Sequence, residues 1–209
     1  MHLTDLCHDL INIPDQTGAI MVTGLAVDSK RVAAGNLFFA LAGSHRDGRD
    51  FICDAIKAGA AAIVTGMAPL AKDIAKLAQE TAIPILQCEN PRRVMAKMAA
   101  IHWSSQPGMV AAVTGTNGKT STTEFLRQLW QRATWQAIAG GTLGITGTNM
   151  IKPDGALLSL PPLTTPDSIS LHAALAPLTK AGVTHLALEA SSHGLEQHRL
   201  DGLNIHIAA

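Results

Sequence analysis

A glycine-rich turn that runs into a lysine contains the residues best suited to chemistry, Gly115-Thr116-Asn117-Gly118-Lys119-Thr120-Ser121. An apolar segment that we expect to be a strand, 109–113, precedes it, and an expected helix, 121–132, follows it. In that order, backbone N–H groups of the turn and of the helix N-terminus surround phosphate oxygens. The Lys119 ammonium suits the outer phosphates of a nucleotide, and the Thr120 hydroxyl is an oxygen ligand for Mg²⁺. The sequence therefore predicts a nucleotide phosphate site.

The turn is shorter than the common phosphate-binding pattern GxxxxGK[ST]. That pattern needs glycine at position 113, and this chain has Val113, which leaves the form GxxGK[ST]. The alternative interpretation is a Gly-Asn turn beside a surface lysine. A strand before the turn and a helix after it favour the phosphate site.

A second group of polar residues follows another expected strand, 185–189. Glu189 ends this strand, and Ser191 comes directly after it. Because ligands of parallel sheets gather at the carboxyl ends of the strands, we expect Glu189 and the glycine-rich turn to share one cleft. Taken alone, Glu189 is an ordinary strand-end carboxylate, and Thr165-Pro166-Asp167 is an ordinary helix start.

The order of the expected elements indicates an α/β protein with two domains. In the first half, strands are expected at 20–22, 24–28, 36–40, 61–64 and 83–87, and helices at 3–10, 50–58 and 70–79. In the second half, strands are expected at 109–113, 135–139 and 185–189, and helices at 91–103, 121–132 and 167–181. Alternating strands and helices in this half predict a mostly parallel sheet.

Three polar residues are expected to cap helices: Asp50 for the helix at 50–58, Asn90 for the helix at 91–103, and Asp167 for the last helix. The Asn90-Pro91 signal places the domain boundary between 88 and 89, which gives domains 1–88 and 89–209. The glycine-rich run 140–144 is expected to be a flexible passage close to a nucleotide or substrate.

Composition excludes several classes of function. The formal net charge is zero and basic residues form no block, so we expect no nucleic-acid partner. No apolar run is long enough to span a bilayer, and the N-terminus lacks a signal-peptide pattern, so we expect a cytoplasmic protein without membrane insertion. The three cysteines form no C-x-x-C pair, and His193 and His198 lack the glutamate of HExxH, so no zinc site is expected.

The segment GTNGKTS resembles the phosphate loop of the Mur ligase family, ATP-dependent amide-forming enzymes of peptidoglycan synthesis that have folylpolyglutamate synthetases as relatives. The segment EASSHGLEQHR, 189–199, looks like one from the MurE branch, which adds the third residue of the stem peptide. Thr164-Thr165-Pro166 is similar to the substrate loop of that branch. Residues 27–31 and 35–48 are similar to the family's uridine-nucleotide domain. The resemblance therefore extends over essentially the whole chain, in the family's order.

The resemblance implies a fold and a set of site residues. The fold would be a small N-terminal α/β uridine-nucleotide domain followed by a central domain of the phosphate-loop type with an incomplete, mostly parallel sheet. ATP would bind at Gly115, Thr116, Asn117, Gly118, Lys119, Thr120 and Ser121, with Lys119 and Glu189 catalytic and Thr120 and Glu189 as Mg²⁺ ligands. The UDP-linked substrate would bind at Val27, Ser29, Ser44, His45, Arg46, Thr164, Thr165, Ser191, Gln197 and Arg199.

The resemblance also implies a reaction and its partners. A cytoplasmic, monomeric ligase would join meso-diaminopimelate to UDP-MurNAc-L-Ala-D-Glu, with ATP first converting the acceptor-facing carboxylate to an acyl phosphate. The identity of the acceptor is not decided at this point. The alternatives to diaminopimelate are lysine and the acceptors of MurF-like and folylpolyglutamate-like ligases. A non-catalytic nucleotide-binding module is the third alternative. In the family, the adenine site, the acceptor site and a carbamoylated lysine lie beyond residue 209, so the central domain is expected to be truncated and this chain alone inactive.

Overall fold

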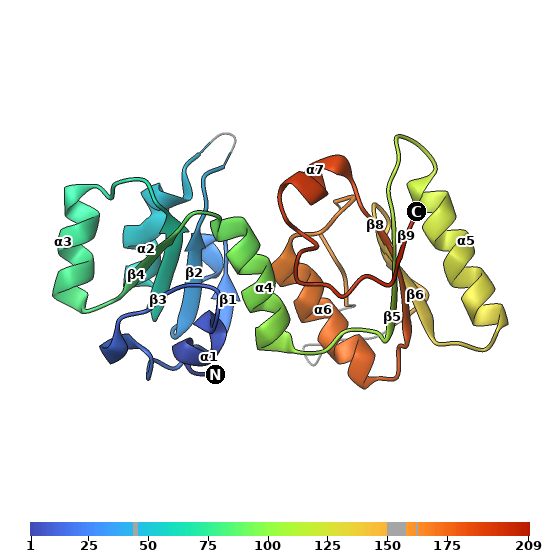
Figure 1. The fold of residues 1–209 in the computed structure, drawn as a ribbon, viewed down its shortest axis with the longest axis horizontal. Helices are drawn as coiled ribbons and strands as arrows, with labels where there is room; N and C mark the ends of the chain where they lie inside the picture. The colour runs from blue at the N-terminus through green and yellow to red at the C-terminus, as the bar shows by residue number, and fades with distance from the viewer. Residues whose placement is uncertain (44–45, 150–157, 162) are drawn as a thin grey trace. The chain divides into compact units, whose positions relative to one another are not determined.

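The computed structural model describes residues 1–43, 46–149, 158–161 and 163–209, and the chain divides into two compact units, Met1–His102 and Trp103–Ala209 (Figure 1). The division expected from sequence, between 88 and 89, falls before helix α4 (Pro91–Trp103), whereas the observed division falls at the end of that helix. Among the described residues, no helix combines the length and the apolar character needed to cross a bilayer.

The first unit is built on a four-stranded parallel sheet in the order β1-β2-β3-β4. Its strands are β1 (Gly24–Ala26), β2 (Asn36–Ala40), β3 (Ala62–Gly66) and β4 (Ile85–Cys88). Its helices are α1 (Leu3–Cys7), α2 (Ile52–Lys57), α3 (Lys72–Thr81) and α4, with short 3₁₀ turns η1 (Asp15–Thr17), η2 (Ser29–Arg31) and η3 (Gly48–Phe51). The apolar side chains of β2, β3 and α2 form its core.

Two expectations for the first unit are wrong in detail. The expected strand at 20–22 forms only an isolated bridge, between Met21 and His2. The expected helix at 50–58 starts at Ile52 and is preceded by η3, whose cap is Asp47 and not Asp50. The Asp47 carboxylate accepts the Arg49 N–H at 2.9 Å. Asp47 is the cap because its backbone is still extended, while Asp50 already lies inside the turn.

The second unit contains a five-stranded sheet in the order β7-β6-β8-β5-β9, parallel except for β7. Its strands are β5 (Met109–Val113), β6 (Ala137–Gly141), β7 (Gly144–Thr146), β8 (His185–Glu189) and β9 (Ile207–Ala208). Its helices are α5 (Lys119–Arg132), α6 (Ser168–Lys180) and α7 (Ser192–Glu196). The predicted α/β fold with a mostly parallel sheet is confirmed.

Helices α5 and α6 cover opposite faces of this sheet (Figure 1). Alternate residues of each strand point to opposite faces, which sorts the core into two layers. The α6 layer contains large side chains such as Leu186 and Leu188. The α5 layer consists mainly of alanines packed against Trp130: Ala111, Ala137, Ala139 and Ala187. The small side chains of this second layer allow α5 to lie close to the sheet.

The sequence did not predict the hairpin formed by β6 and β7. The glycine-rich run expected to be a flexible passage instead belongs to two antiparallel strands, with Gly141 opposite Gly144. Glycine weakens the strand signal because it has no side chain to pack, so the pattern of residues 140–144 resembles a loop. The short helix α7 was also not predicted.

The cap of α6 gives a stability prediction. The Asp167 carboxylate accepts the Ser170 N–H at 2.9 Å, as the sequence predicted. We expect Asp167→Ala to lower the free energy of unfolding of the second unit by roughly 1 kcal/mol, whereas Asp167→Asn retains the cap. All three tryptophans lie in that unit, so urea unfolding followed by tryptophan fluorescence reports on it. Equal stability of the Ala and Asn variants would contradict the assignment of the cap.

Candidate phosphate and metal site

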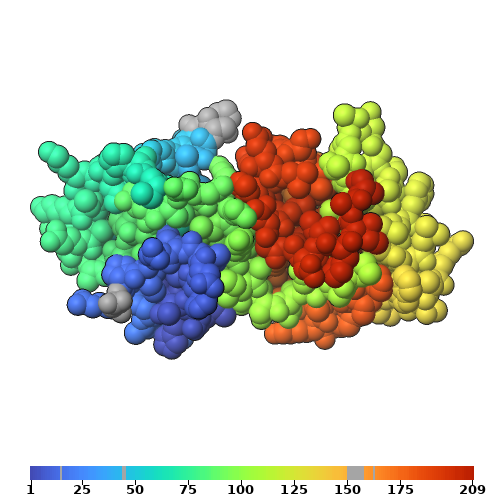
Figure 2. Space-filling view, in the orientation of Figure 1, coloured from blue at the N-terminus to red at the C-terminus, as the bar shows by residue number. Residues whose placement is uncertain are grey.

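The glycine-rich turn joins β5 to α5 and projects from the second unit (Figure 2). Its residues 114–118 are exposed. Gly118, at φ +81°, is the N-cap of α5, a backbone conformation that glycine adopts without strain. The Lys119 ammonium donates to the Gly115 carbonyl oxygen at 2.6 Å, so the lysine side chain lies across the turn.

Helix α5 starts at Lys119, earlier than the sequence predicted. Its first backbone bond runs from the Thr122 N–H to the Gly118 carbonyl, at 2.8 Å. The N–H groups of Lys119, Thr120 and Ser121 belong to the first turn, which has no carbonyl partner inside the helix. These donors, the helix dipole and the lysine together form a geometry suited to phosphate.

Glu189 lies beside this turn because of strand pairing. It is the last residue of β8 and is opposite Val113, the last residue of β5, in the parallel ladder. Its side chain is buried, at 2% exposure. The Thr142 N–H donates to Glu189 Oε1 at 2.9 Å, and the Thr142 hydroxyl donates to Oε2 at 3.2 Å. In the described part of the chain, no Lys, Arg or His forms an ion pair with this carboxylate.

Thr120 and Glu189 line the same pocket, together with Glu124, Gly141 and Thr146. A buried carboxylate without a basic partner favours a cation, because buried charges are normally paired or bound to metal. Mg²⁺ in nucleotide sites takes one or two protein oxygen ligands and completes its shell with phosphates and water. The hydroxyl of Thr120 and the carboxylate of Glu189 therefore fit Mg²⁺. No cluster of three His, Cys, Asp or Glu side chains suited to a metal exists among the described residues.

Thr165 connects the end of β8 to the loop before α6. Its side chain is 1% exposed, and its hydroxyl donates to the Glu189 carbonyl oxygen at 3.0 Å. The same hydroxyl accepts the Ser191 N–H at 2.8 Å and lies 3.0 Å from the Ser191 hydroxyl. Ser191 in turn caps α7 by accepting the Gly194 N–H at 3.1 Å. This set of bonds fixes the segment that follows Glu189.

Three further predicted residues lie in the same neighbourhood. Arg199 donates to the Thr165 carbonyl oxygen at 2.6 Å and to Gln197 Oε1 at 2.8 and 3.2 Å. The Thr164 hydroxyl is 3.3 Å from that of Thr142. The structure thus brings Thr164, Thr165, Ser191, Gln197 and Arg199 together with Glu189 in one set of hydrogen bonds.

The candidate uridine site belongs to the first unit. Val27 and Ser29 follow the end of β1, and Arg46 follows the end of β2, its parallel neighbour. These residues therefore lie toward the same edge of the first sheet. The Gly43 N–H donates to the Arg46 carbonyl oxygen at 2.9 Å. Ser44 and His45 lie outside the described residues.

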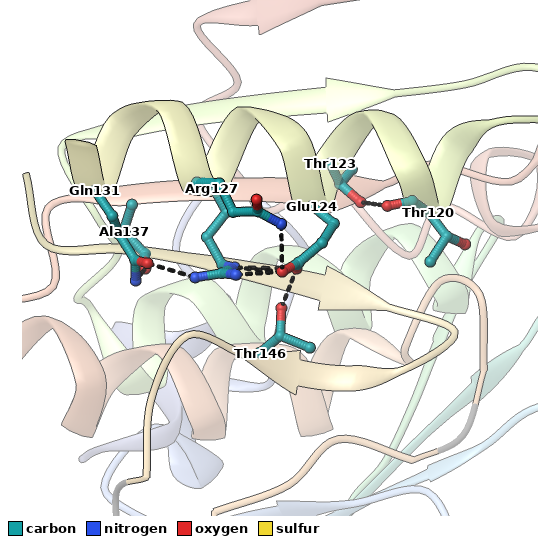
Figure 3. A network of polar contacts seen from close by, with 8 residues as sticks. Thr120, Thr123, Glu124, Arg127, Gln131, Ala137 and Thr146 are labelled. Carbon is teal, nitrogen blue, oxygen red and sulfur yellow. Dashed lines mark hydrogen bonds and ion pairs between the residues drawn. The ribbon is translucent and has the colours of Figure 1, made fainter. Parts of the chain in front are cut away.

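Sequence reasoning missed an ion pair on α5 that also contacts the hairpin (Figure 3). Arg127 Nε lies 3.0 Å from both carboxylate oxygens of Glu124, and the Thr146 hydroxyl donates to Glu124 Oε2 at 2.8 Å. Gln131 Nε2 donates to the Ala137 carbonyl oxygen at 2.9 Å. Hydrogen bonds from Arg127, and then from Thr146, lower the pKa of Glu124 to about 2. The i,i+3 spacing of Glu124 and Arg127 was visible in the sequence. The partners on the hairpin were not.

The geometry of the second unit defines a class of protein. A strand, a glycine-rich turn with a lysine, and a helix, with a carboxylate at the end of the adjacent strand, have the arrangement typical of α/β domains that bind nucleotide phosphates. Within that class, the chain belongs to the Mur ligase family. Residues 113–209 match the Mur ligase middle domain, and residues 21–103 match the domain described as the Mur ligase family catalytic domain.

Two curated relatives illustrate the similarity, and both are named UDP-N-acetylmuramoyl-L-alanyl-D-glutamate–2,6-diaminopimelate ligase. The protein from Bradyrhizobium diazoefficiens is 45% identical over 98% of this chain, and the protein from Rhizobium meliloti is 40% identical over 100% of it. The alignments cover 39% and 41% of those proteins. This chain thus spans about two fifths of the length of the curated relatives it matches.

Solved structures agree with this assignment. A structure of a ligase with the same name matches all of this chain and 39% of its own, with a TM-score of 0.77 and 30% identity. MurF ligase from Thermotoga maritima, in complex with ADP, matches 92% of this chain and 37% of its own, with a TM-score of 0.51 and 22% identity. The second match shows a shared fold only.

The lowered pKa of Glu124 predicts how stability depends on pH. A carboxyl whose pKa is lower in the folded state stabilises the fold above its unfolded pKa, and this stabilisation is lost as the pH falls through the folded value. We therefore expect wild type to have a higher free energy of unfolding than Glu124→Gln near neutral pH. This difference should shrink as the pH falls from about 5 toward about 2.

Urea unfolding followed by tryptophan fluorescence at several pH values measures this difference. Glu196→Gln is the matched control, because that side chain lies on the surface of the same unit, at 79% exposure. A Glu124→Gln difference that is constant with pH would contradict the lowered pKa.

Proposed function

We propose that this chain supplies the nucleotide-substrate and ATP-phosphate sites of a ligase that joins meso-diaminopimelate to UDP-MurNAc-L-Ala-D-Glu. The observation that carries the proposal is the pairing of Val113 with Glu189, which sets a buried carboxylate beside a phosphate-binding turn. The names of the similar proteins support the choice of substrates and of diaminopimelate as the acceptor. We assign the UDP-linked substrate's nucleotide to domain 1–88 and ATP to domain 89–209.

The proposed reaction needs ATP because a carboxylate is a poor acyl donor. The γ-phosphoryl group passes to a carboxylate oxygen of the substrate with release of ADP. The amine of the acceptor then attacks the acyl carbon, forms the amide and releases phosphate. The task of the protein is to neutralise charge and to hold the reacting groups in line.

Each site residue has a defined part in this proposal. Lys119 and the amides of residues 115–121 hold the outer phosphates, and the position of the ammonium over the turn supports this role. Thr120 and Glu189 hold Mg²⁺, which when bound supplies positive charge to the phosphates.

The peptide end of the substrate is assigned to the polar set around Thr165. Thr164, Ser191, Gln197 and Arg199 offer hydroxyl, amide and guanidinium groups that suit sugars and carboxylates, and the buried Thr165 hydroxyl holds the segment that carries them. Their hydrogen bonds to the segment that carries Glu189 support the assignment, because the carboxylate to be activated must lie close to the metal and the γ-phosphate.

The uridine diphosphate is assigned to Val27, Ser29, Ser44, His45 and Arg46. The exposed Val27 offers an apolar surface for the base, and the exposed Arg46 offers charge for the diphosphate. We also propose that the intact enzyme is cytoplasmic and monomeric.

Loss of the lysine gives the first test of this proposal. We expect Lys119→Ala to weaken binding of Mg·ATP by about 10- to 100-fold, because a charge-assisted bond to phosphate is worth roughly 1.5–3 kcal/mol. Isothermal titration of the 209-residue chain measures the affinity. Lys180→Ala, an exposed lysine at the end of α6, is the control and should bind as wild type does. Unchanged affinity in Lys119→Ala would refute the phosphate site.

Titration with UDP tests the first unit separately. We expect saturable binding of UDP that is weakened by Ser29→Ala and by Arg46→Ala, because each removes a polar group assigned to the nucleotide. Lys57→Ala, exposed at the end of α2, should bind UDP normally, and none of these variants should alter binding of Mg·ATP. Equal UDP affinity in all variants would reject the assigned residues.

A further inference from the structure

We propose that the β6–β7 hairpin positions Glu189. Thr142 is the positioning residue, and Thr146 bonds the hairpin to helix α5. The inference rests on the proposed function, because it concerns the carboxylate assigned to the Mg²⁺ of Mg·ATP. It assigns a role to residues that the sequence motifs do not include. Thr142 and Thr146 contact Glu189 and Glu124 at opposite ends of the hairpin.

One residue, Thr142, binds both oxygens of the Glu189 carboxylate. The Thr142 N–H donates to Glu189 Oε1 at 2.9 Å and its hydroxyl to Oε2 at 3.2 Å. Two bonds from one residue fix the orientation of the carboxylate plane. Each oxygen has a second lone pair, which stays available for a cation. Outer contacts of this kind orient metal ligands in many sites.

The backbone at Gly141 approaches the Glu189 carboxylate closely. A Cβ atom added there would lie 2.2 Å from Glu189 Oε1 and 2.5 Å from its Cδ. No side chain fits in that space, so glycine at position 141 is a condition for the contact between the hairpin and the carboxylate. Gly141 also ends β6, which places Thr142 at the tip of the hairpin.

The hairpin is attached to α5 by hydrogen bonds that involve both of its strands (Figure 3). On β7, the Thr146 hydroxyl donates to Glu124, which is bound by Arg127 on the next turn of the same helix. At the start of β6, the Ala137 carbonyl oxygen accepts from Gln131. Helix α5 therefore contacts both strands of the hairpin, and the same helix begins with Lys119 and Thr120.

The two carboxylates of the pocket consequently have different roles. The charge of Glu124 is compensated by Arg127, and its oxygens accept bonds from Arg127 and Thr146. Among the described residues, the carboxylate of Glu189 accepts hydrogen bonds from Thr142 only, whereas its backbone carbonyl is bonded to Thr165. Glu189 is thus the carboxylate available to a cation, and Glu124 fixes the hairpin that orients it.

The test compares Thr142→Val with Thr142→Ser in the 209-residue chain. Valine keeps the size and the backbone N–H but removes the hydroxyl, whereas serine keeps the hydroxyl. We expect Thr142→Val to weaken binding of Mg·ATP about 10-fold, with little change in binding of ATP in EDTA. The increase in ATP affinity that Mg²⁺ gives over EDTA, the Mg²⁺-dependent gain, should therefore fall in Thr142→Val and be retained in Thr142→Ser. Thr146→Val should reduce the same gain by a smaller factor.

Controls separate positioning from general damage. Thr179→Val, near the end of α6, removes a hydroxyl outside the site and should leave both affinities unchanged. Glu189→Gln should abolish the Mg²⁺-dependent gain. A loss of affinity for ATP in EDTA as large as the loss for Mg·ATP in Thr142→Val would indicate structural damage and would overturn the positioning role.

Two outcomes distinguish this inference from the proposed function. A wild-type chain that binds ATP equally well with and without Mg²⁺ would refute the metal role of Glu189 and, with it, the proposed function. A wild-type chain with a clear Mg²⁺-dependent gain that Glu189→Gln loses and Thr142→Val keeps would overturn the inference alone.

Discussion

The parallel pairing of β5 with β8 is the constraint on which the candidate site depends. It aligns Val113 with Glu189, so the glycine-rich turn and the buried carboxylate start from adjacent points at one edge of the sheet. The side chains of a strand alternate between faces, so a shift of one residue would reverse the direction of every side chain in β8. The apolar layers on both faces, with Leu188 on one and Ala187 on the other, fix the register and therefore the place of the carboxylate.

Sequence reasoning succeeded where a local signal is strong. The bounds of β2, β5 and β8 are those expected, because each is an apolar run that turn residues or polar residues delimit. The caps at Asn90 and Asp167 are also confirmed, since the Arg93 and Ser170 N–H groups bind their side chains. In these cases a few neighbouring residues decide the local structure.

The parts that sequence reasoning missed depend on contacts between distant segments. The hairpin has a weak strand pattern, and its contacts are with distant segments: β6 pairs with β8, and single residues bond to α5 and to Glu189. Thr142 and Thr146 carry no local sign of these partners, which lie far away in the sequence. Asp47 replaced Asp50 as a cap because the exact turn geometry decides which of two nearby carboxylates reaches an amide. Resemblance identified the residues around Thr165, whereas their mutual hydrogen bonds became visible only in the folded chain.

The alanine layer beneath α5 has a consequence for variation in this protein. Ala111, Ala137, Ala139 and Ala187 have no polar atoms, yet their small volume sets the distance between helix and sheet. A larger side chain in this layer would displace α5, and Lys119 would move with the helix while Glu189 stayed on its strand. The distance between the N-terminus of α5 and the Glu189 carboxylate therefore depends partly on these alanine methyl groups, although the methyl groups are not part of the candidate site. If the proposed function holds, substitutions in this layer would alter nucleotide recognition without changing any group assigned to contact the nucleotide.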